Sequence, residues 1–368
     1  MERVFLYGTL RYAPLLKFVL GEEGAASPAT LKGHGVFHAG QESYPRLGEA
    51  AGEVQGLLVE GAEAAARIAF YEAVFGYRAA PVTVEVEGAA VTAHAFLAGE
   101  GVPAAGAEWS LEAWIDAWGD TTLHFAREVM GQYGSTDAKH LRTMTPTMKA
   151  RAWARTLAQE TKPPPLGAPP STAPEVIAER RPYINFFSLC EADLRPPRFE
   201  GGLGRAVSRA AFIGFDAAVV LPYDPVRDRV HLIEQFRMAP FFRGDPQRFL
   251  VEAVAGGVDP GERPEAAAFR EAREEADLEL RALHLVSKHY PSSSSFTEYL
   301  YVYVGIADLP DGAAKLGGLS TEEEDIKGHV LDYGRFAELL DADAFNVGPL
   351  ILAGHWLARH RDRLRREA

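Results

Sequence analysis

The sequence predicts two α+β domains joined by a proline-rich segment. The chain has 368 residues, more than one average domain, which favours two domains. Residues 161–174, "TKPPPLGAPPSTAP", are typical of a semi-rigid linker, because proline lacks a backbone N–H donor and favours extended geometry. On both sides of this segment, alternating strand patterns are mixed with a few helical ones. We expect a first domain over residues 1–160 and a second over 175–368; a long loop inside one domain is the alternative.

The first half predicts strands followed by helices. Residues 3–10, "RVFLYGTL", have the pattern of a strand that runs into a glycine turn. Residues 81–98 alternate between apolar and polar on both sides of a Glu-Gly pair, which predicts a hairpin. Residues near 108–133 and 137–160 have a helical pattern. The three tryptophans of the first helical stretch are expected to pack it onto the sheet, since large aromatic side chains chiefly serve as core; they are Trp109, Trp114 and Trp118.

The second half predicts more strands, a C-terminal helix and the carboxylate-rich helix described below. Pro222, Asp224 and Pro225 predict a turn between two strands in the stretch "AAVVLPYDPVRDRVHLIEQFR". Further elements are expected at 248–254 (strand), 279–290 (strand), 298–305 (strand) and 346–366 (helix).

Composition and charge narrow the classes of partner. The chain is 47% hydrophobic and 24% charged, as ordinary globular proteins are. The formal net charge of −13 argues weakly against nucleic acid or an anionic membrane as the main partner, but it does not forbid an anionic small-molecule substrate held by local arginines or metal ions. Cys190 is the only cysteine, which excludes an intramolecular disulfide and fits a reducing compartment. Without a recognisable secretory signal or an apolar run as long as a membrane span, the sequence predicts a cytoplasmic protein.

One short helix carries an unusual concentration of carboxylates. The stretch "AGGVDPGERPEAAAFREAREEADLEL" places Glu271, Glu274 and Glu275 on one helix face, where like charges repel. Pro264 fits the first turn of this helix. Carboxylates gathered at one point are the hard oxygen ligands that Mg²⁺ or Mn²⁺ prefers, and a divalent cation would turn the repulsion into attraction. The alternative is an ordinary solvated acidic face.

This stretch resembles the Nudix box. All fixed positions but one match in type and spacing; the matching ones include Gly256, Glu262, Arg270, Glu271, Glu274 and Glu275. The final glycine of the pattern is replaced by Asp277, and Ala272 is small for its apolar slot. Because Asp tolerates the left-handed conformation better than most residues, we expect the helix to end there all the same. The resemblance implies a Nudix α/β/α sandwich.

The resemblance also implies residue roles. Glu271 and Glu275 correspond to the main metal ligands, and Glu274 to a further ligand with a catalytic part. The backbone carbonyl of Ala255 is a possible additional ligand. Arg270 would orient the glutamates, and Glu262 would support the metal shell. The reaction implied is hydrolysis of a nucleoside diphosphate linked to another group, with Mg²⁺ (Mn²⁺ possible) neutralising the developing charge.

The surrounding sequence resembles the bacterial ADP-ribose pyrophosphatase branch of the family. The resemblance rests on "FDAAVVLPYDPVRDRVHLIEQFRMAP", "FLVEAVAGGVDPGE", "EEEDIKGHVLDYGRF" and "NVGPLILAGHWLARH". It implies that Arg237 holds the diphosphate and that Glu298 is the general base. The alternatives are a surface ion pair for Arg237 and a plain strand-start glutamate for Glu298. Glu322, Glu323 and Glu324 could reach the metals or form an exposed acidic loop.

The same branch implies a homodimer. Phe187 (or Phe186) would stack on adenine, with Arg209 of the partner subunit on the other face; aromatic core is the alternative for the phenylalanines. The activity implied is hydrolysis of ADP-ribose to AMP and ribose 5-phosphate. A hydrolase of another nucleotide sugar, such as GDP-mannose, and a non-catalytic ADP-ribose sensor are the rival interpretations.

The first domain resembles gamma-glutamylcyclotransferase-like proteins over about residues 3–100. The matching pieces are "VFLYGTLR", "YPRL", "VQGLLVE" and "FYEAVFGYRAAPVTVEV". The resemblance implies a mixed β-barrel with helices. Backbone groups of the turn Tyr7, Gly8, Thr9 and Leu10 would bind a γ-glutamyl carboxylate. Glu72 would be the acid/base in a cyclisation that releases 5-oxoproline. Ala69-Phe70-Tyr71 departs from the usual leucine-aspartate before that glutamate, so a non-catalytic binding or dimerising module is the alternative.

Overall fold

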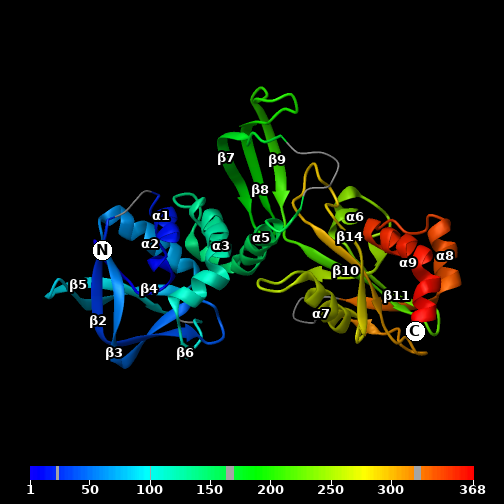
Figure 1. Cartoon of the computed structure of the whole chain (residues 1–368), viewed down its shortest axis with the longest axis horizontal. Coiled ribbons are helices and arrows are strands. Elements are labelled where there is room, and N and C mark those ends of the chain that lie inside the picture. Colours follow the sequence, from blue (N-terminus) through cyan, green and yellow to red (C-terminus); the bar gives the residue numbers. More distant parts are fainter. Residues whose placement is uncertain (22–24, 100, 163–169, 319–324) are drawn as a thin grey trace. The chain divides into compact units, whose positions relative to one another are not determined.

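The computed structural model describes residues 1–21, 25–99, 101–162, 170–318 and 325–368. The chain divides into two compact units, Met1–Arg209 and Ala210–Ala368 (Figure 1). The centre of the expected linker, residues 163–169, and Glu322–Glu324 lie outside the described residues. Residues 175–209, expected with the second domain, group with the first unit. The domain boundary at 161–174 therefore stays a prediction.

A mixed β-barrel forms the sheet of the first unit. The strand order is β3-β1-β5-β4-β2-β6, and an additional pairing of β3 with β2 closes the ring. β1 and β5 run parallel, whereas the other neighbouring strands of this order pair antiparallel. The expected barrel is thus confirmed. Its strands are β1 (Arg3–Leu6), β2 (Ala26–Ala39), β3 (Pro45–Glu60), β4 (Tyr77–Val86), β5 (Ala89–Ala98) and β6 (Ala105–Glu108).

The β4–β5 connection confirms the expected hairpin. Its two central residues, Glu87 and Gly88, have φ of 50° and 83°. Two successive residues with positive φ make a turn whose twist matches that of the flanking strands. The ten-residue ladder from Tyr77 opposite Ala98 to Val86 opposite Ala89 follows directly.

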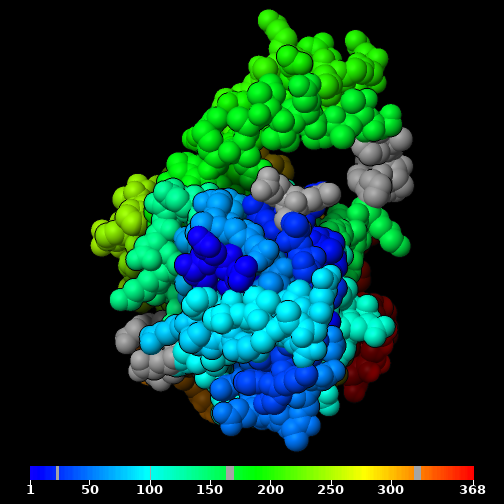
Figure 2. Space-filling view, turned by 90° about the vertical axis from the view of Figure 1, so that its left-hand side faces the viewer, coloured from blue at the N-terminus to red at the C-terminus, as the bar shows by residue number. Residues whose placement is uncertain are grey.

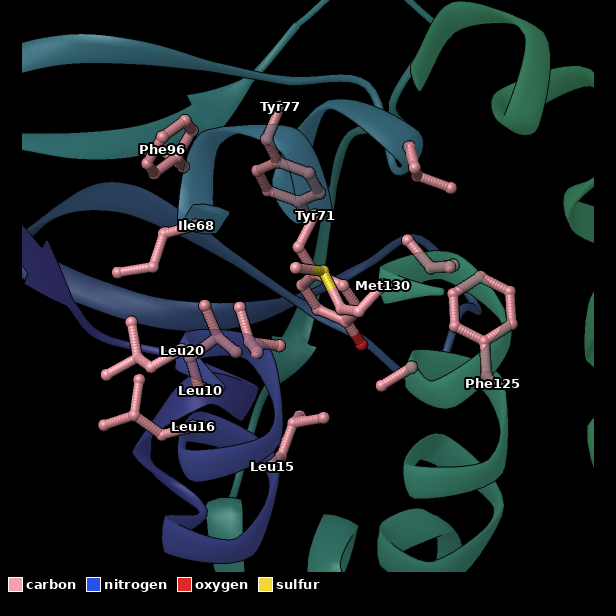
Figure 3. Packing of buried hydrophobic residues seen from close by; sticks show 14 of the residues in the cluster. Leu10, Leu15, Leu16, Leu20, Ile68, Tyr71, Tyr77, Phe96, Phe125 and Met130 are labelled. Carbon is pink, nitrogen blue, oxygen red and sulfur yellow. The ribbon is translucent and has the colours of Figure 1, made fainter. Parts of the chain in front are cut away.

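Helices cover the barrel and share its core. They are η1 (Thr9–Arg11), α1 (Ala13–Leu20), α2 (Ala62–Val74), α3 (Leu111–Met130), α4 (Ala138–Thr143) and α5 (Thr145–Ala158). In Figure 3, leucines of η1 and α1, Tyr71 of α2 and Met130 of α3 point into one interior. Trp109 and Trp114 are buried in this core and Trp118 packs against it, as expected. The blue and cyan segments of this unit form one closely filled surface (Figure 2).

A small three-stranded sheet follows, with β7 (Glu175–Ile184), β8 (Ser188–Arg195) and β9 (Val207–Ile213) in that order. The β7–β8 turn is fixed to the helices of the first unit by Arg151, which is 1% exposed. Arg151 pairs with Glu128 at 2.6 Å, and its Nη1 donates to the carbonyl oxygen of Phe186 at 2.7 Å. The buried charge is therefore both paired and hydrogen-bonded, as burial requires.

The second unit is the expected α/β/α sandwich. Its main sheet has the order β14-β15-β10-β11-β17-β16, with β12 on β11 and β13 on β10. Neighbouring residues of β15 show that helices lie on both faces: Val302 and Val304 pack in the core cluster that includes α9, whereas the Tyr303 hydroxyl donates to Glu265 of α7. The strands are β10 (Ala217–Asp224), β11 (Arg229–Phe236), β12 (Phe249–Glu252), β13 (Val254–Gly257), β14 (Ala282–His289), β15 (Leu300–Ile306), β16 (Leu316–Gly317) and β17 (Ile326–Asp332). The helices are α6 (Met238–Arg243), α7 (Pro264–Ala276), α8 (Tyr333–Asp341) and α9 (Gly348–Glu367).

The carboxylate helix α7 begins and ends as expected. Pro264 occupies its first turn, where no N–H donor is needed. Asp277 at the C-terminal end has φ 52° and ψ 41°, the left-handed conformation expected for it. The N–H of Leu278 donates to the carbonyl of Ala272, which satisfies a helix-end carbonyl. Asp277 therefore serves in the place of the usual glycine.

Candidate active site

Arg270 connects the acidic side chains of α7 with the loop before it. Its Nη1 donates to Oε1 of Glu271 at 2.6 Å and to Oε2 of Glu274 at 3.0 Å. Nε and Nη2 both donate to the carboxylate of Glu262, and Nη2 also donates to the carbonyl of Gly257. Burial disfavours the guanidinium charge, but these carboxylates outweigh it and raise the pKa of Arg270. The orienting role expected for Arg270 thus has a geometric basis.

The other face of α7 lies against strand β13. Glu271 and Glu275 are 8% and 4% exposed. Oε2 of Glu275 accepts from the backbone N–H of Ala255 at 2.9 Å. A Cβ at Gly256 would lie 2.0 Å from Oε1 of Glu271, so a side chain there would collide with the carboxylate. Glycine at this position is therefore what lets the Glu271 carboxylate reach the strand.

The same residues offer a divalent cation suitable donors. In the described part of the chain, no three His, Cys, Asp or Glu side chains are grouped closely enough to hold a metal ion. Arg270 instead forms ion pairs with Glu262, Glu271 and Glu274. Carboxylate and carbonyl oxygens are nevertheless the ligands that Mg²⁺ prefers, and Gly256 leaves room for them beside the strand. Glu271, Glu274, Glu275 and the carbonyl of Ala255 could thus hold the metal.

A second group of polar side chains lies near the start of β15. Arg237 pairs with Glu252 at 2.6 Å. Burial raises the pKa of the half-buried Glu298 to about 6, and the charge of Arg237 partly opposes that rise. Arg237 and Glu298, singled out separately in the sequence, therefore lie close enough to interact. This places a carboxyl with a pKa of about 6 beside a permanent cation.

Asp216 joins this group and was not predicted. It is 4% exposed, and burial raises its pKa to about 7, with the charge of Glu298 contributing. The hydroxyl of Tyr301 donates to its Oδ2 at 3.4 Å. Its position follows from register, because Ala217 pairs with both Gly257 of β13 and Leu300 of β15. The sequence signal was weak: a carboxylate directly before a buried apolar strand.

The first unit contains a separate carboxyl group whose pKa is raised far above its ordinary value. Glu72 of α2 is half-buried, and burial raises its pKa to about 8. The charge of Glu72 in turn contributes to the raised pKa values of Tyr7 and Tyr77, for which burial is the larger cause. Glu72 therefore faces a tyrosine-lined environment in which it holds its proton at neutral pH.

The segments that carried the first-domain resemblance meet around Glu72. The turn at Gly8 lies against the "YPRL" segment, since a Cβ at Gly8 would come 2.7 Å from Pro45. The hydroxyl of Tyr77 donates to the carbonyl of Pro45, and that of Tyr7 donates to the carbonyl of Phe96 at 2.6 Å. Thr9 begins the short helix η1, and Leu10 is buried at 2% exposure. Tyr7 and Gly8 thus lie in the environment of Glu72, while the Leu10 side chain belongs to the core.

Comparison with known proteins matches both halves to families. Residues 4–115 match the family model "Gamma-glutamyl cyclotransferase, AIG2-like", and residues 215–349 match the NUDIX domain. An ADP-ribose pyrophosphatase of Escherichia coli (strain K12) is 35% identical over 193 residues, 52% of this chain and 91% of that protein. The chain belongs to the Nudix family. Both resemblances expected from the sequence are confirmed, and the Nudix residues are those that follow the small three-stranded sheet.

Two further relatives of this Nudix chain are named for different substrates. An ADP-ribose pyrophosphatase of Haemophilus influenzae is 31% identical over 50% of this chain and 85% of that protein. A GDP-mannose pyrophosphatase of Cronobacter sakazakii is 31% identical over 41% of this chain and 78% of that protein. A crystal structure described as an ADP compounds hydrolase aligns with a TM-score of 0.40 and 21% identity, over 52% of this chain and 98% of that chain.

Two expected substrate contacts of the Nudix reaction lie in the first unit. Phe187 is 40% exposed at the β7–β8 turn, with its ring centroid 4.8 Å from that of Phe186. Phe186 is 53% exposed beside it. Arg209, on β9, is exposed and donates to the carbonyl of Ser208. Their role at adenine stays a prediction. Among the described residues, the helices lack the combined length and apolar character needed to cross a membrane.

Proposed function

We propose that the Nudix domain hydrolyses ADP-ribose to AMP and ribose 5-phosphate with Mg²⁺, or Mn²⁺, as its metal. The observation that carries this proposal is the complete acidic set of α7, organised by Arg270 and seated against Ala255 and Gly256. Relatives named ADP-ribose pyrophosphatase, matched over most of their length, support the choice of substrate.

The chain's own residues supply the rest of the reaction. When bound, the metal neutralises charge on the diphosphate and lowers the pKa of the attacking water. Glu298 accepts the proton of that water, since a carboxyl with a pKa of about 6 is mostly ionised at neutral pH. Arg237 offers the diphosphate two parallel N–H donors in place of its contact with Glu252. Arg270 orients the ligands Glu271 and Glu274.

A substrate panel tests this proposal directly. Purified full-length protein with Mg²⁺ is incubated with ADP-ribose, GDP-mannose and other nucleotide sugars, and the products are separated by chromatography. We expect AMP and ribose 5-phosphate from ADP-ribose at the highest kcat/KM. Preferred cleavage of GDP-mannose would replace the substrate assignment. Tight binding of ADP-ribose without cleavage would favour the sensor interpretation.

The quaternary state and location complete this proposal. The protein acts as a cytoplasmic homodimer associated through the C-terminal domain. In this dimer, Phe187 of one subunit stacks on adenine and Arg209 of the partner subunit covers the other face. Exposed apolar side chains at β11, α6 and β12 support a covered surface on the Nudix domain; they include Phe236, Phe241 and Phe249. Analytical ultracentrifugation is expected to give a dimer, and a monomer at all working concentrations would contradict it.

A second function is favoured by the environment of Glu72. We propose that the first unit releases 5-oxoproline from a γ-glutamyl compound. The substrate's α-amine attacks its γ-carbonyl carbon, the bond to the released amine breaks, and the proton lost by the attacking nitrogen goes through Glu72 to the released amine. A carboxyl with a pKa of about 8 suits this exchange in both directions. Release of 5-oxoproline by wild type and its loss in Glu72→Gln test the assignment; equal release by both would contradict it.

A further inference from the structure

Three arginines of the first unit come together where two helices meet the small three-stranded sheet. Arg127 belongs to α3, Arg155 to α5 and Arg181 to β7, and we call them the arginine cluster. Burial, followed by the charges of Arg181 and Arg127, lowers the pKa of Arg155. The three guanidinium groups therefore lie close enough to repel one another, and an anion among them would offset that repulsion.

The packing of α3 against α5 fixes the two helical members of the cluster. Glu128 of α3 pairs with Arg151 of α5 at 2.6 Å, and the hydroxyl oxygens of Thr121 and Thr156 lie 2.8 Å apart further along the same two helices. These two contacts align the helices antiparallel. The helical arginines of the cluster lie in sequence between the two contacts on each helix, so the alignment holds them on neighbouring turns.

Arg181 brings the small sheet to the same place. A Cβ at Gly131, just after α3, would come 4.0 Å from Cδ of Arg181, and Nε2 of Gln132 donates to the carbonyl of Arg181 at 3.4 Å. The Arg181 side chain is 7% exposed, and its Nη2 donates to Oε1 of Glu179 at 3.1 Å. Among the residues that the structure describes, this is the one acceptor of the guanidinium. A largely buried guanidinium with a single contact keeps further donors for a second anion.

The acidic side chains around the cluster do not balance it. Burial opposes ionisation of Glu179, but the hydrogen bond and charge of Arg181, with the charge of Arg127, outweigh it and lower the pKa of Glu179. Asp120 acts on His124 at the edge of the cluster. In the described part of the chain, the two helical arginines have no carboxylate within ion-pair distance. Three positive charges against these two carboxylates leave one positive charge in excess, in a chain whose formal net charge is −13.

We propose that the arginine cluster is a binding site for a phosphate dianion, either free phosphate or the phosphoryl group of a phosphomonoester. Two oxygens of a phosphate match the paired N–H donors of a guanidinium, so Arg127 and Arg155 each offer it a bidentate contact. Arg181 adds its remaining donors. The bound dianion joins α3, α5 and β7 and strengthens the attachment of the small sheet to the helices. The site uses none of the residues assigned to the two proposed activities.

Calorimetric titration of the full chain with inorganic phosphate tests this site. The buffer contains EDTA, which prevents divalent cations from linking phosphate to the carboxylates of α7, and the ionic strength is held constant with chloride. We expect saturable binding by wild type and about tenfold weaker binding by Arg155→Gln, the loss of one charge-assisted contact. Arg127→Gln is a second variant with the same expected effect.

Two control variants separate the cluster from other cations. Arg78→Gln, at an exposed arginine of β4, keeps the wild-type affinity for phosphate because Arg78 lies outside the cluster. Arg237→Gln also keeps that affinity, since the diphosphate contact proposed for Arg237 belongs to the Nudix domain.

His124 reports whether the phosphate binds at the cluster. Burial, followed by the charges of Arg155 and Arg127, lowers the pKa of His124. Because a bound dianion offsets those charges, phosphate is expected to raise the pKa of His124 in wild type but not in Arg155→Gln. The measurement is a pH titration of the histidine ring signals by NMR, with the His124 signal assigned from its loss in His124→Gln.

A parallel titration with ribose 5-phosphate distinguishes the two sources of the dianion. Tighter binding of ribose 5-phosphate than of inorganic phosphate identifies a phosphomonoester as the ligand, and the opposite order identifies free phosphate. Either order supports the site when Arg155→Gln weakens binding. The proposal is overturned if wild type shows no saturable binding, if Arg155→Gln and Arg127→Gln both bind as wild type does, or if Arg237→Gln alone loses binding.

Discussion

The proposed hydrolysis depends on individual side chains, and substitution of Glu275 tests it most directly. Its carboxylate is 4% exposed and accepts from the N–H of Ala255. We expect Glu275→Gln to lower turnover of ADP-ribose by orders of magnitude, because an amide is a poor metal ligand, while the fold is kept. The measurement is kcat with Mg²⁺, together with the circular dichroism spectrum. Glu279→Gln, at an exposed glutamate just beyond α7, is the control. Hydrolysis by Glu275→Gln at the wild-type rate would defeat the metal assignment.

The general base is tested by pH. Because burial holds the pKa of Glu298 at about 6, the carboxylate that accepts a proton is lost as the pH falls below that value. We expect kcat/KM for ADP-ribose to be level above about pH 7 and to fall about tenfold per pH unit well below 6.

The same profile measured on Glu298→Gln separates a base from a plain strand-start glutamate. Loss of the acidic limb together with a large drop in rate identifies the base. An unchanged pH profile and an unchanged rate in this variant would show that Glu298 has no catalytic role.

The raised pKa of Glu72 predicts how the stability of the folded chain depends on pH. Its pKa is about 8 in the folded chain against an ordinary value of 4.5, so the folded state holds this proton more tightly. The stabilisation is fully present below pH 4.5 and is lost as the pH rises through about 8. We expect Glu72→Gln to gain stability relative to wild type between pH 6 and pH 9, measured by denaturant unfolding. Parallel pH dependences of the two proteins would contradict the raised pKa.

At the scale of an element, the end of α7 offers a matched pair of variants. Asp277 adopts a left-handed conformation that costs most non-glycine residues about 1 kcal/mol or more. Its exposed ion pair with Lys315 contributes little, because such pairs are worth about 0–1 kcal/mol. We expect Asp277→Gly to be neutral or stabilising and Asp277→Ala to be less stable than Asp277→Gly by about 1 kcal/mol. Equal thermal stability of the two variants would show that the cap carries no strain.

The elements show which features follow from sequence alone. The helix α7, its proline start and its aspartate stop were predictable because each depends on residues within a few positions of one another. The same holds for the β4–β5 hairpin, where Glu87 and Gly88 set the turn. Closure of the barrel by pairing of β2 with β3, by contrast, depends on the register of two long strands, which local patterns do not specify.

The parts of the sites that escaped prediction depend on distant neighbours. Asp216 becomes a buried carboxyl only because β10 pairs with β13 and β15, which brings Tyr301 and Glu298 beside it. Residue type and spacing identified chemistry that lies within one segment, whereas chemistry assembled from several segments required the fold.

At the scale of the whole molecule, the chain combines two carboxylate sites of different character. Each lies within its own compact unit, Met1–Arg209 or Ala210–Ala368. The acidic set of α7 is organised by hydrogen bonds from Arg270, whereas burial raises the pKa of Glu72 to about 8 in a tyrosine-lined environment. We therefore expect Glu72→Gln to leave ADP-ribose hydrolysis unchanged and Glu275→Gln to leave 5-oxoproline release unchanged. A large effect of either variant on the other reaction would show that the two activities are coupled.

The most direct measurement is the chromatographic product profile of full-length protein incubated with ADP-ribose and Mg²⁺, before and after chelation. Equal amounts of AMP and ribose 5-phosphate that appear with the metal and cease when EDTA removes it are the expected result. Intact ADP-ribose after prolonged incubation with saturating Mg²⁺ or Mn²⁺ would contradict the hydrolase assigned to α7.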